Sequence, residues 1–145
     1  MNLLPLAALL TLAAPLAAQD LGTIHVTKSP TCGCCSAWVD LARAEGYAVE
    51  TTDTLALPEA KLDAGVPVPL WSCHTATIDG YVIEGHVPFD ALARLLADRP
   101  AIDGLSVPGM PAGSPGMGDD PTAVYDVIAF GQEAGDGTLY HRAGQ

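Results

Sequence analysis

Residues 23–35 read Thr-Ile-His-Val-Thr-Lys-Ser-Pro-Thr-Cys-Gly-Cys-Cys, an alternating run that ends in three cysteines within four positions. The alternation of β-branched residues over Thr23–Thr27 predicts a strand. A helix is predicted from about Cys35 to Glu45, because apolar residues recur there at helical spacing. We expect three of them to share its buried face: Trp38, Leu41 and Ala42. The cysteine motif therefore lies between a strand and the first turn of a helix.

Strands and helices continue to alternate after this first helix. Asp79-Gly80 predicts a tight hairpin turn, because such turns need positive φ angles. The stretch from Leu105 to Pro121 is rich in Gly, Pro, Ser and Met without periodicity, which predicts a loop. The other expected elements are a strand at Tyr47–Thr52, a helix at Pro58–Asp63, an extended connection at 65–69, hairpin strands at Thr75–Ile78 and Tyr81–Glu84, a helix at Phe89–Asp98, and terminal strands at Val124–Phe130 and Thr138–His141.

This order of elements predicts an α/β fold, namely a thioredoxin-like sandwich with a C-terminal Gly/Pro/Met loop and terminal strands. A cysteine motif after the first strand of that fold lies at the N-terminus of the first helix, and the segment before the hairpin lies opposite it. We therefore expect Cys73 to face Cys32, Cys34 and Cys35 in space. His74 is expected to point away from the Cys73 side chain, because neighbouring side chains alternate in extended backbone.

The composition limits the classes of function. A chain of 145 residues, 49% of them hydrophobic, is long enough for one domain with a core. Acidic residues outnumber basic ones 17 to 6, and the net charge of −11 argues against nucleic acid or an anionic membrane as a partner. The 4 cysteines are therefore the principal source of chemistry.

The first residues have the features of a signal peptide. Met1–Ala18 is apolar, carries no charged side chain and ends in Leu16-Ala17-Ala18, small residues suited to cleavage. We predict a signal peptide at 1–18 and one exported domain at 19–145 without stable membrane association. A buried N-terminal helix and a retained membrane anchor are the alternatives.

The cysteine spacing is compatible with two kinds of chemistry. Cys32 and Cys35 have the C-x-x-C spacing of thiol–disulfide exchange enzymes, but Cys34 adds a thiol that a redox pair does not need. A disulfide between neighbouring cysteines is strained, because bridged α-carbons prefer a wider separation. The start of a helix favours thiolate, the ligand form, and Gly33 is expected to let the sulfur atoms approach one another. Three close thiols with Cys73 as the fourth therefore suit a metal better than two independent disulfides.

The ligand types narrow the choice of metal. Thiolate and thioether ligands suit Cu(I), while an all-thiolate site also suits zinc. The C-x-C-C spacing is cramped for one tetrahedral zinc ion, whereas close thiolates can bridge several ions. Met110 and Met117 in the Gly/Pro-rich loop add soft donors and favour copper. A zinc site and a plain disulfide framework stay open as alternatives.

Four motifs occur along the chain in an order typical of one family. They are Lys28-Ser29-Pro30-Thr31-Cys32-Gly33-Cys34-Cys35, Ser72-Cys73-His74-Thr75, Glu84-Gly85-His86-Val87-Pro88 and Val107-Pro108-Gly109-Met110-Pro111. This set resembles the CopG-like family of exported copper-resistance proteins, which are unrelated to the DNA-binding repressors of the same name. The resemblance covers about residues 23–130.

The resemblance implies a thioredoxin-like fold in the periplasm of a Gram-negative bacterium and a cysteine-bridged cluster of several Cu(I) ions. The implied role is copper tolerance, with interconversion of Cu(I) and Cu(II) as the candidate activity. Copper ions and other periplasmic copper-handling proteins are the implied partners.

We predict that residues beyond the cysteines complete the copper site. His86 and Met110 are expected as additional ligands, and His74 and Met117 stay open. The predicted ligand set is Cys32, Cys34, Cys35, Cys73, His86 and Met110. Two other functions stay open: a thiol–disulfide oxidoreductase that uses Cys32 and Cys35, and a copper chaperone with an exposed site.

Overall fold

Strand β1 (Thr23–Lys28) opens the part of the chain that the structure, a computed structural model, describes: residues 21–144. Its alternating pattern buries Ile24, Val26 and Lys28 and leaves His25 exposed. β1 lies in the interior of the sheet, with β2 (Ala48–Asp53) parallel on one side and β3 antiparallel on the other. The chain turns from the end of β1 directly into the cysteine motif.

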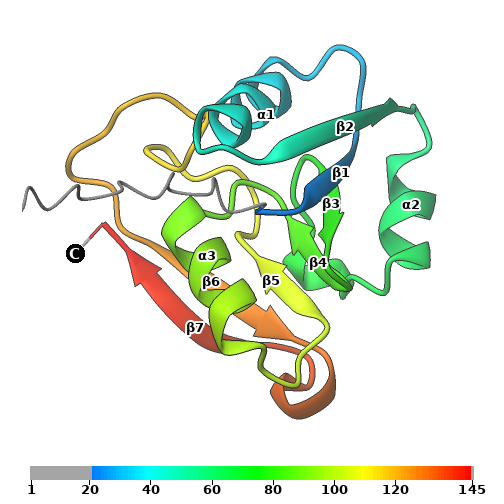
Figure 1. The fold of residues 1–145 in the computed structure, drawn as a ribbon, viewed down its shortest axis with the longest axis vertical. Helices are drawn as coiled ribbons and strands as arrows, with labels where there is room; N and C mark the ends of the chain where they lie inside the picture. The colour runs from blue at the N-terminus through cyan, green and yellow to red at the C-terminus, as the bar shows by residue number, and fades with distance from the viewer. Residues whose placement is uncertain (1–20, 145) are drawn as a thin grey trace, which may run out of the picture.

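The sheet has seven strands in the order β2-β1-β3-β4-β5-β6-β7 (Figure 1). The pairs β1/β2 and β4/β5 are parallel, and the remaining neighbours are antiparallel. The strands beyond β2 are β3 (Thr75–Ile78), β4 (Tyr81–Glu84), β5 (Gly104–Ser106), β6 (Tyr125–Phe130) and β7 (Thr138–Ala143). The mixed sheet and its helices are the α/β architecture that the sequence predicts.

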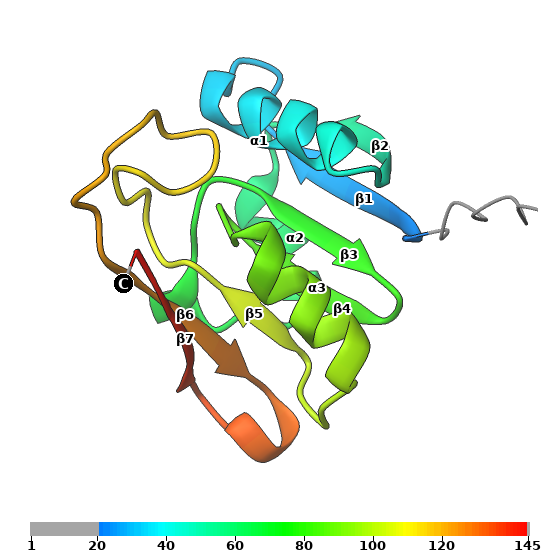
Figure 2. The same ribbon diagram turned by 60° about the vertical axis from the view of Figure 1, so that its left-hand side comes forward.

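The helices cover both faces of the sheet. Helices α1 (Gly33–Ala44) and α3 (Phe89–Asp98) lie on one face, where Trp38 stacks on Phe89 at 5.3 Å between ring centroids (Figure 2). Helix α2 (Leu57–Asp63) lies on the other face, followed by the 3₁₀ helix η1 (Val68–Leu70). A second 3₁₀ helix, η2 (Gln132–Ala134), connects β6 to β7.

The main core fills the space between the sheet and the α1/α3 layer. Its fully buried side chains come from both helices and from the inner face of the strands: Ile24, Trp38, Ile83, Leu92, Leu95 and Leu105. Burial of such side chains supplies about 1.5–3 kcal/mol each of hydrophobic free energy. A smaller cluster around Val66, Leu70 and Phe130 covers the opposite face.

Most predicted elements are present, with shifted ends. The hairpin β3/β4 and helix α3 have the predicted bounds. Helix α1 begins at Gly33, earlier than predicted, because Cys32 forms its N-cap. The prediction that Leu41 lies on the buried face was wrong: Leu41 is 42% exposed, and Val39 is buried with Trp38 instead.

The predicted loop from Leu105 to Pro121 was partly wrong, because it hides strand β5. Three residues are too few to show an alternating pattern. Gly104 marks the strand, since a Cβ there would collide with the carbonyl of Val82 in β4. The expected extended connection at 65–69 also differs, because η1 begins within it.

The predicted signal peptide at 1–18 lies outside the described residues. Within residues 21–144, no helix has the length and apolar character needed to cross a membrane.

Candidate metal centre

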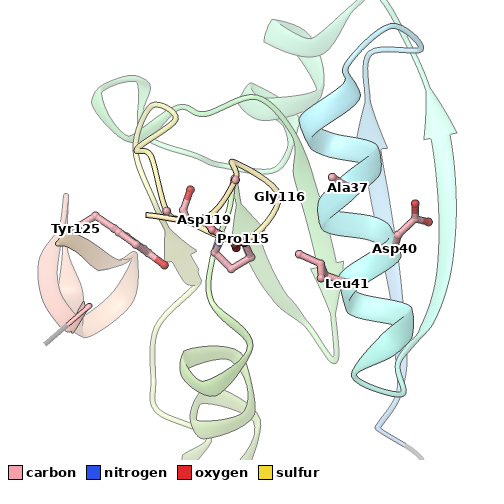
Figure 3. Close-up of a pocket in the computed structure, with 10 residues that line it drawn as sticks. Ala37, Asp40, Leu41, Pro115, Gly116, Asp119 and Tyr125 are labelled. Carbon is pink, nitrogen blue, oxygen red and sulfur yellow. The ribbon is translucent and has the colours of Figure 1, made fainter. Parts of the chain in front are cut away.

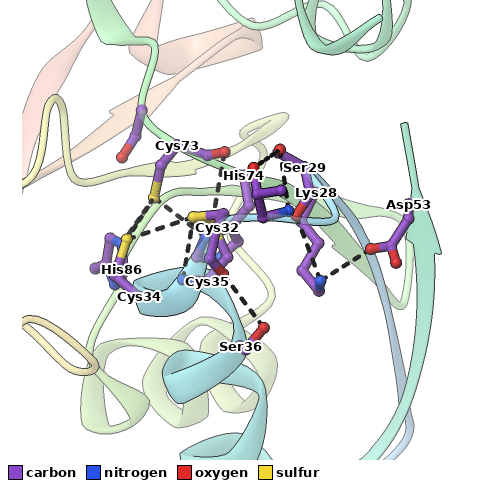
Figure 4. The surroundings of a disulfide bond; sticks show 12 residues. Lys28, Ser29, Cys32, Cys34, Cys35, Ser36, Asp53, Cys73, His74 and His86 are labelled. Carbon is purple, nitrogen blue, oxygen red and sulfur yellow. Dashed lines mark hydrogen bonds and ion pairs between the residues drawn. A yellow bond between two sulfur atoms is a disulfide. The ribbon is translucent and has the colours of Figure 1, made fainter. Parts of the chain in front are cut away.

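The N-terminus of α1 gathers three of the four cysteines (Figure 4). Cys32 adopts extended backbone as the N-cap, and its Sγ accepts a hydrogen bond from the backbone N–H of Cys35 at 3.3 Å. Sulfur thus takes the capping position that Ser or Asp commonly occupies. A disulfide joins Cys32 to Cys35, and the Sγ of Cys34 lies 3.4 Å from that of Cys32. The tight first turn therefore places all three sulfur atoms at one end of the helix.

Cys73 brings the fourth sulfur to the same place, as the sequence predicts. It lies between η1 and β3, with its Sγ 4.0 Å from the Sγ of Cys34. Its carbonyl oxygen lies 3.7 Å from the Sγ of Cys35. The four cysteine sulfur atoms all lie within 4.8 Å of one another. A bound metal or a thiol reaction at this point can therefore involve Cys73 together with the three cysteines at the start of α1.

His86 extends the cluster on its buried side. This residue is 0% exposed, and its Nε2 lies 2.7 Å from the Sγ of Cys73. Its Nδ1 lies 2.6 Å from the carbonyl oxygen of Pro115. A carbonyl only accepts, so Nδ1 carries the proton, and in the neutral ring Nε2 presents its lone pair to the sulfur. This is the arrangement of a metal-ligating histidine whose other nitrogen is fixed by a backbone acceptor.

His74 is the site residue that sequence reasoning placed wrongly. Its Nδ1 lies 3.5 Å from the Sγ of Cys73, on the same side as that sulfur. The alternation rule fails because the chain bends between Cys73 and β3 and is not regular strand there. Cys73, His74 and His86 form a second group of metal-ligating atoms within 4.8 Å of one another. The buried Nε2 of His74 has no hydrogen-bond partner among the described residues.

Burial keeps this side of the site uncharged without a metal. Burial lowers the pKa of His74 to about 3, with smaller contributions from His86, Lys61 and Lys28. Burial also lowers the pKa of His86, against the opposing effect of its bond to Pro115. The pKa of Cys73 is raised to about 12, first by burial and then by Cys34. At neutral pH the metal-free site therefore holds a Cys73 thiol that donates to a neutral His86.

The loop between β5 and β6 covers the site and carries the two predicted methionines. Gly109 and Ser72 form an isolated parallel β-bridge. Met110 and Cys73 are the residues that follow this bridge on the two segments. The Met110 side chain is 56% exposed. Met117 lies in a turn in which its backbone N–H donates to the carbonyl of Ser114 at 2.8 Å.

The proposed role of Gly33 was wrong. A Cβ added at Gly33 meets nothing within 4 Å, so a side chain there would not obstruct the sulfur atoms. The glycine that permits close approach is Gly116 in the covering loop. Its φ is +88°, and a Cβ there would lie 2.8 Å from the carbonyl oxygen of Cys34 and 2.9 Å from the backbone nitrogen of Trp38.

A separate depression of about 560 Å³ lies between α1 and this loop (Figure 3). Leu41 and Asp40 of α1 line one side, and Asp119 and Tyr125 line the other. None of the four cysteines lines it. The depression is therefore a neighbour of the sulfur cluster and not part of it.

The remaining histidines lie elsewhere. His25 on the exposed face of β1 is 3.1 Å from Glu50, and His141 on β7 is 3.7 Å from Asp90.

Comparisons with known proteins agree with this site. A family model described as "Protein of unknown function, DUF411" matches residues 70–117, which include Cys73, His86 and both loop methionines. No curated protein matches. Two solved structures, "Copper resistance protein copG- Form 2" and "Copper resistance protein copG- Form 1", share 34% sequence identity with this chain at a TM-score of 0.77. The first match covers 83% of this chain and 97% of that chain, and the second covers 85% and 98%. Because the identity of 34% extends over nearly all of those two chains, the chain belongs to the CopG family of copper resistance proteins.

Proposed function

We propose that this protein binds several copper ions as a cysteine-bridged Cu(I) cluster and serves copper resistance. The observation that carries this proposal is the convergence of four cysteine sulfur atoms within 4.8 Å of one another. The proposed ligands are the thiolates of Cys32, Cys34, Cys35 and Cys73, with His86 and Met110 as additional donors.

The donor set of the structure fits copper. Thiolate and thioether ligands select Cu(I), and imidazole also suits copper. The Nδ1 of His74, 3.5 Å from the Sγ of Cys73, is a further candidate donor at the site. One zinc ion would need a tetrahedral arrangement that neighbouring Cys34 and Cys35 make difficult.

The residues of the chain prepare the site for metal. A dithiol reductant, itself oxidised to a disulfide with release of two protons, would convert the Cys32–Cys35 disulfide into two thiolates, so that all four cysteine sulfur atoms are available for metal. Cys73 would release its proton to solvent as metal binds, and the Nε2 of His86, 2.7 Å from that sulfur, keeps its lone pair as a donor. The carbonyl of Pro115 accepts from Nδ1–H and holds the ring in the orientation that presents Nε2 to the site. Bound copper supplies one-electron chemistry, and we propose interconversion of Cu(I) and Cu(II) as the activity.

We further propose a thioredoxin-like core in an exported, periplasmic protein that works with other periplasmic copper-handling proteins. The order β2-β1-β3-β4, with α1 after β1 and α3 after β4, supports the thioredoxin-like assignment. The apolar segment Met1–Ala18 supports export.

A second candidate function is thiol–disulfide exchange. The disulfide between Cys32 and Cys35 favours it, because it joins the two cysteines of a C-x-x-C pair. In that case Cys73 is dispensable, since the reaction needs the pair alone.

The variant Cys73→Ser separates the two candidates. The copper cluster loses a bridging thiolate, so we expect the reduced variant to retain less copper per chain than the parent, measured by elemental analysis after desalting. A thiol–disulfide oxidoreductase would keep its disulfide reductase activity in the same variant. Unchanged copper content together with unchanged reductase activity would contradict the cluster. His25→Gln, on the exposed face of β1, is the control for a substitution away from the site.

A further inference from the structure

A buried carboxylate lies behind the metal centre, on the sheet face opposite α1. Glu84 at the end of β4 is 0% exposed. Its Oε1 accepts from the Nζ of Lys61 at 2.6 Å and from the backbone N–H of Ser72 at 2.6 Å. Its Oε2 accepts from the hydroxyl of Thr75 at 2.7 Å, and Lys61 also reaches that hydroxyl at 3.1 Å. We call Glu84 with Lys61, Ser72 and Thr75 the Glu84 clamp.

The Glu84 clamp encloses the segment that carries Cys73. One carboxylate binds Ser72 on one side of Cys73-His74 and Thr75 on the other. The next residue along β4, Gly85, donates its backbone N–H to the carbonyl of His74 at 2.9 Å. Residues 72–75 are therefore tied at three points to residues 84–85, and His86 follows immediately. The distance between Cys73 and His86 depends on these ties.

We propose that Glu84 is a positioning residue for the metal centre, holding Cys73 against His86 and toward Cys34. This inference rests on the proposed copper function. It adds that metal binding requires Glu84, which is not itself a ligand. Lys61 compensates the charge of the carboxylate, because its ammonium group forms an ion pair with the Oε1 of Glu84. Lys61 itself is only 4% exposed. Neither residue lies among the sulfur atoms, so the Glu84 clamp acts through the backbone of Ser72 and the hydroxyl of Thr75.

The physical reason for a charged pair at this position is geometry and not stability. A buried ion pair is costly to desolvate, and replacing one with apolar residues of similar volume is often neutral or stabilising. A carboxylate, however, accepts several hydrogen bonds in fixed directions, which an apolar side chain cannot do. Supporting hydrogen bonds of this kind typically change metal affinity by about 10–100-fold when removed.

Two double variants separate positioning from folding. Lys61→Met with Glu84→Leu removes both charges and both carboxylate acceptors of the Glu84 clamp without leaving a buried charge unpaired. Lys61→Met with Glu84→Gln removes the same charges but keeps an acceptor for the N–H of Ser72. We expect the first to lower Cu(I) affinity by about 10–100-fold in competition with a chromophoric Cu(I) chelator, and the second to restore most of the loss.

A measurement without copper tests the same inference. In the disulfide form the free cysteines are Cys34 and Cys73, and peptide mass spectrometry distinguishes their alkylation by iodoacetamide. The leucine double variant is expected to increase the alkylation rate of Cys73 while that of Cys34 stays at the parent value. The glutamine double variant is expected to stay close to the parent at both cysteines.

The control is Ser106→Ala in the neighbouring strand. Ser106 pairs with Glu84 across β4/β5 and donates a buried hydrogen bond to the carbonyl of Leu70 at 2.6 Å. Its loss removes a comparable hydrogen bond without touching Ser72 or Thr75, so Cys73 should react as in the parent. If the leucine double variant does not fold, Thr75→Val removes one tie of the Glu84 clamp and is expected to shift Cys73 alkylation in the same direction.

Two results would overturn the inference. One is equal Cys73 reactivity in the parent and the folded leucine variant. The other is a parallel increase at Cys34 and Cys73, which means general loosening of the fold. A parent chain that binds no copper contradicts the proposed function instead, and the alkylation rates still decide the role of Glu84.

Discussion

At the scale of single residues, His74 is a neutral side chain kept in the interior beside the sulfur atoms. Its ring lies 4.9 Å from Trp38 and 5.1 Å from His86 between centroids. Burial lowers its pKa to about 3, whereas an unfolded chain has the ordinary value of 6.5. The unfolded chain therefore binds a proton between pH 6.5 and about 3 that the folded, metal-free chain does not.

This difference predicts an acid-sensitive fold. The free energy of unfolding of the metal-free chain should fall as the pH decreases below 6.5, with His74 contributing up to about 1.4 kcal/mol per pH unit. His74→Phe keeps a ring against Trp38 and removes the titrating group, so its stability should depend less steeply on pH. Urea unfolding at pH 7 and pH 5 measures both slopes. Identical slopes in parent and variant would show that His74 is not the group responsible.

At the scale of elements, the decisive contact joins α1 to the loop between β5 and β6. Gly116 lies against the backbone of Cys34 and Trp38, and the neighbouring Pro115 accepts from His86. The loop thus fixes the orientation of His86 from a position far along the chain, as Figure 2 shows where the loop returns beside α1.

Gly116→Ala should open this contact. A Cβ at that position has no room against Cys34 and Trp38, so the loop must move and weaken the bond from His86 to Pro115. We expect a loss of about 1–3 kcal/mol in stability relative to the control Gly118→Ala, together with faster loss of copper to a chelator. Gly118 has a similar φ of +84° but nothing within 4 Å of its Cβ position, so it shares only the backbone cost. Equal stability and copper retention in the two variants would contradict the contact.

Long patterned elements could be predicted from the sequence, and short ones could not. The hairpin and α3 are marked by an Asp-Gly turn and by helical periodicity, and both match the structure. Strand β5 has three residues and no readable period, so its place in the sheet depends on tertiary contacts with β4 and β6. The loop that follows it gives no pattern at all, although it covers the metal centre.

At the scale of the whole molecule, the fold brings together chemistry that is spread along the sequence. The convergence of Cys73 with the first helix could be predicted, because the order of elements determines which segments are neighbours. The direction of the His74 side chain could not be predicted, since it depends on a local bend before β3. The Glu84 clamp could not be predicted either. A glutamate at the end of a strand normally faces solvent, whereas Glu84 at the end of β4 is buried.

Under the proposed function, the disulfide form and the reduced form of the chain differ in metal capacity. With the Cys32–Cys35 disulfide formed, two thiols remain free at the site. Reduction provides four cysteine sulfur atoms within the same volume, and each can lose its proton when a cation binds. Under the proposed function, copper binding and thiol oxidation therefore compete for Cys32 and Cys35.

The most direct test is the metal content of the reduced chain, exposed anaerobically to copper and zinc together and then desalted. The proposed copper cluster predicts several copper ions in each molecule and little zinc. A single zinc ion in each molecule, with no copper, would contradict it.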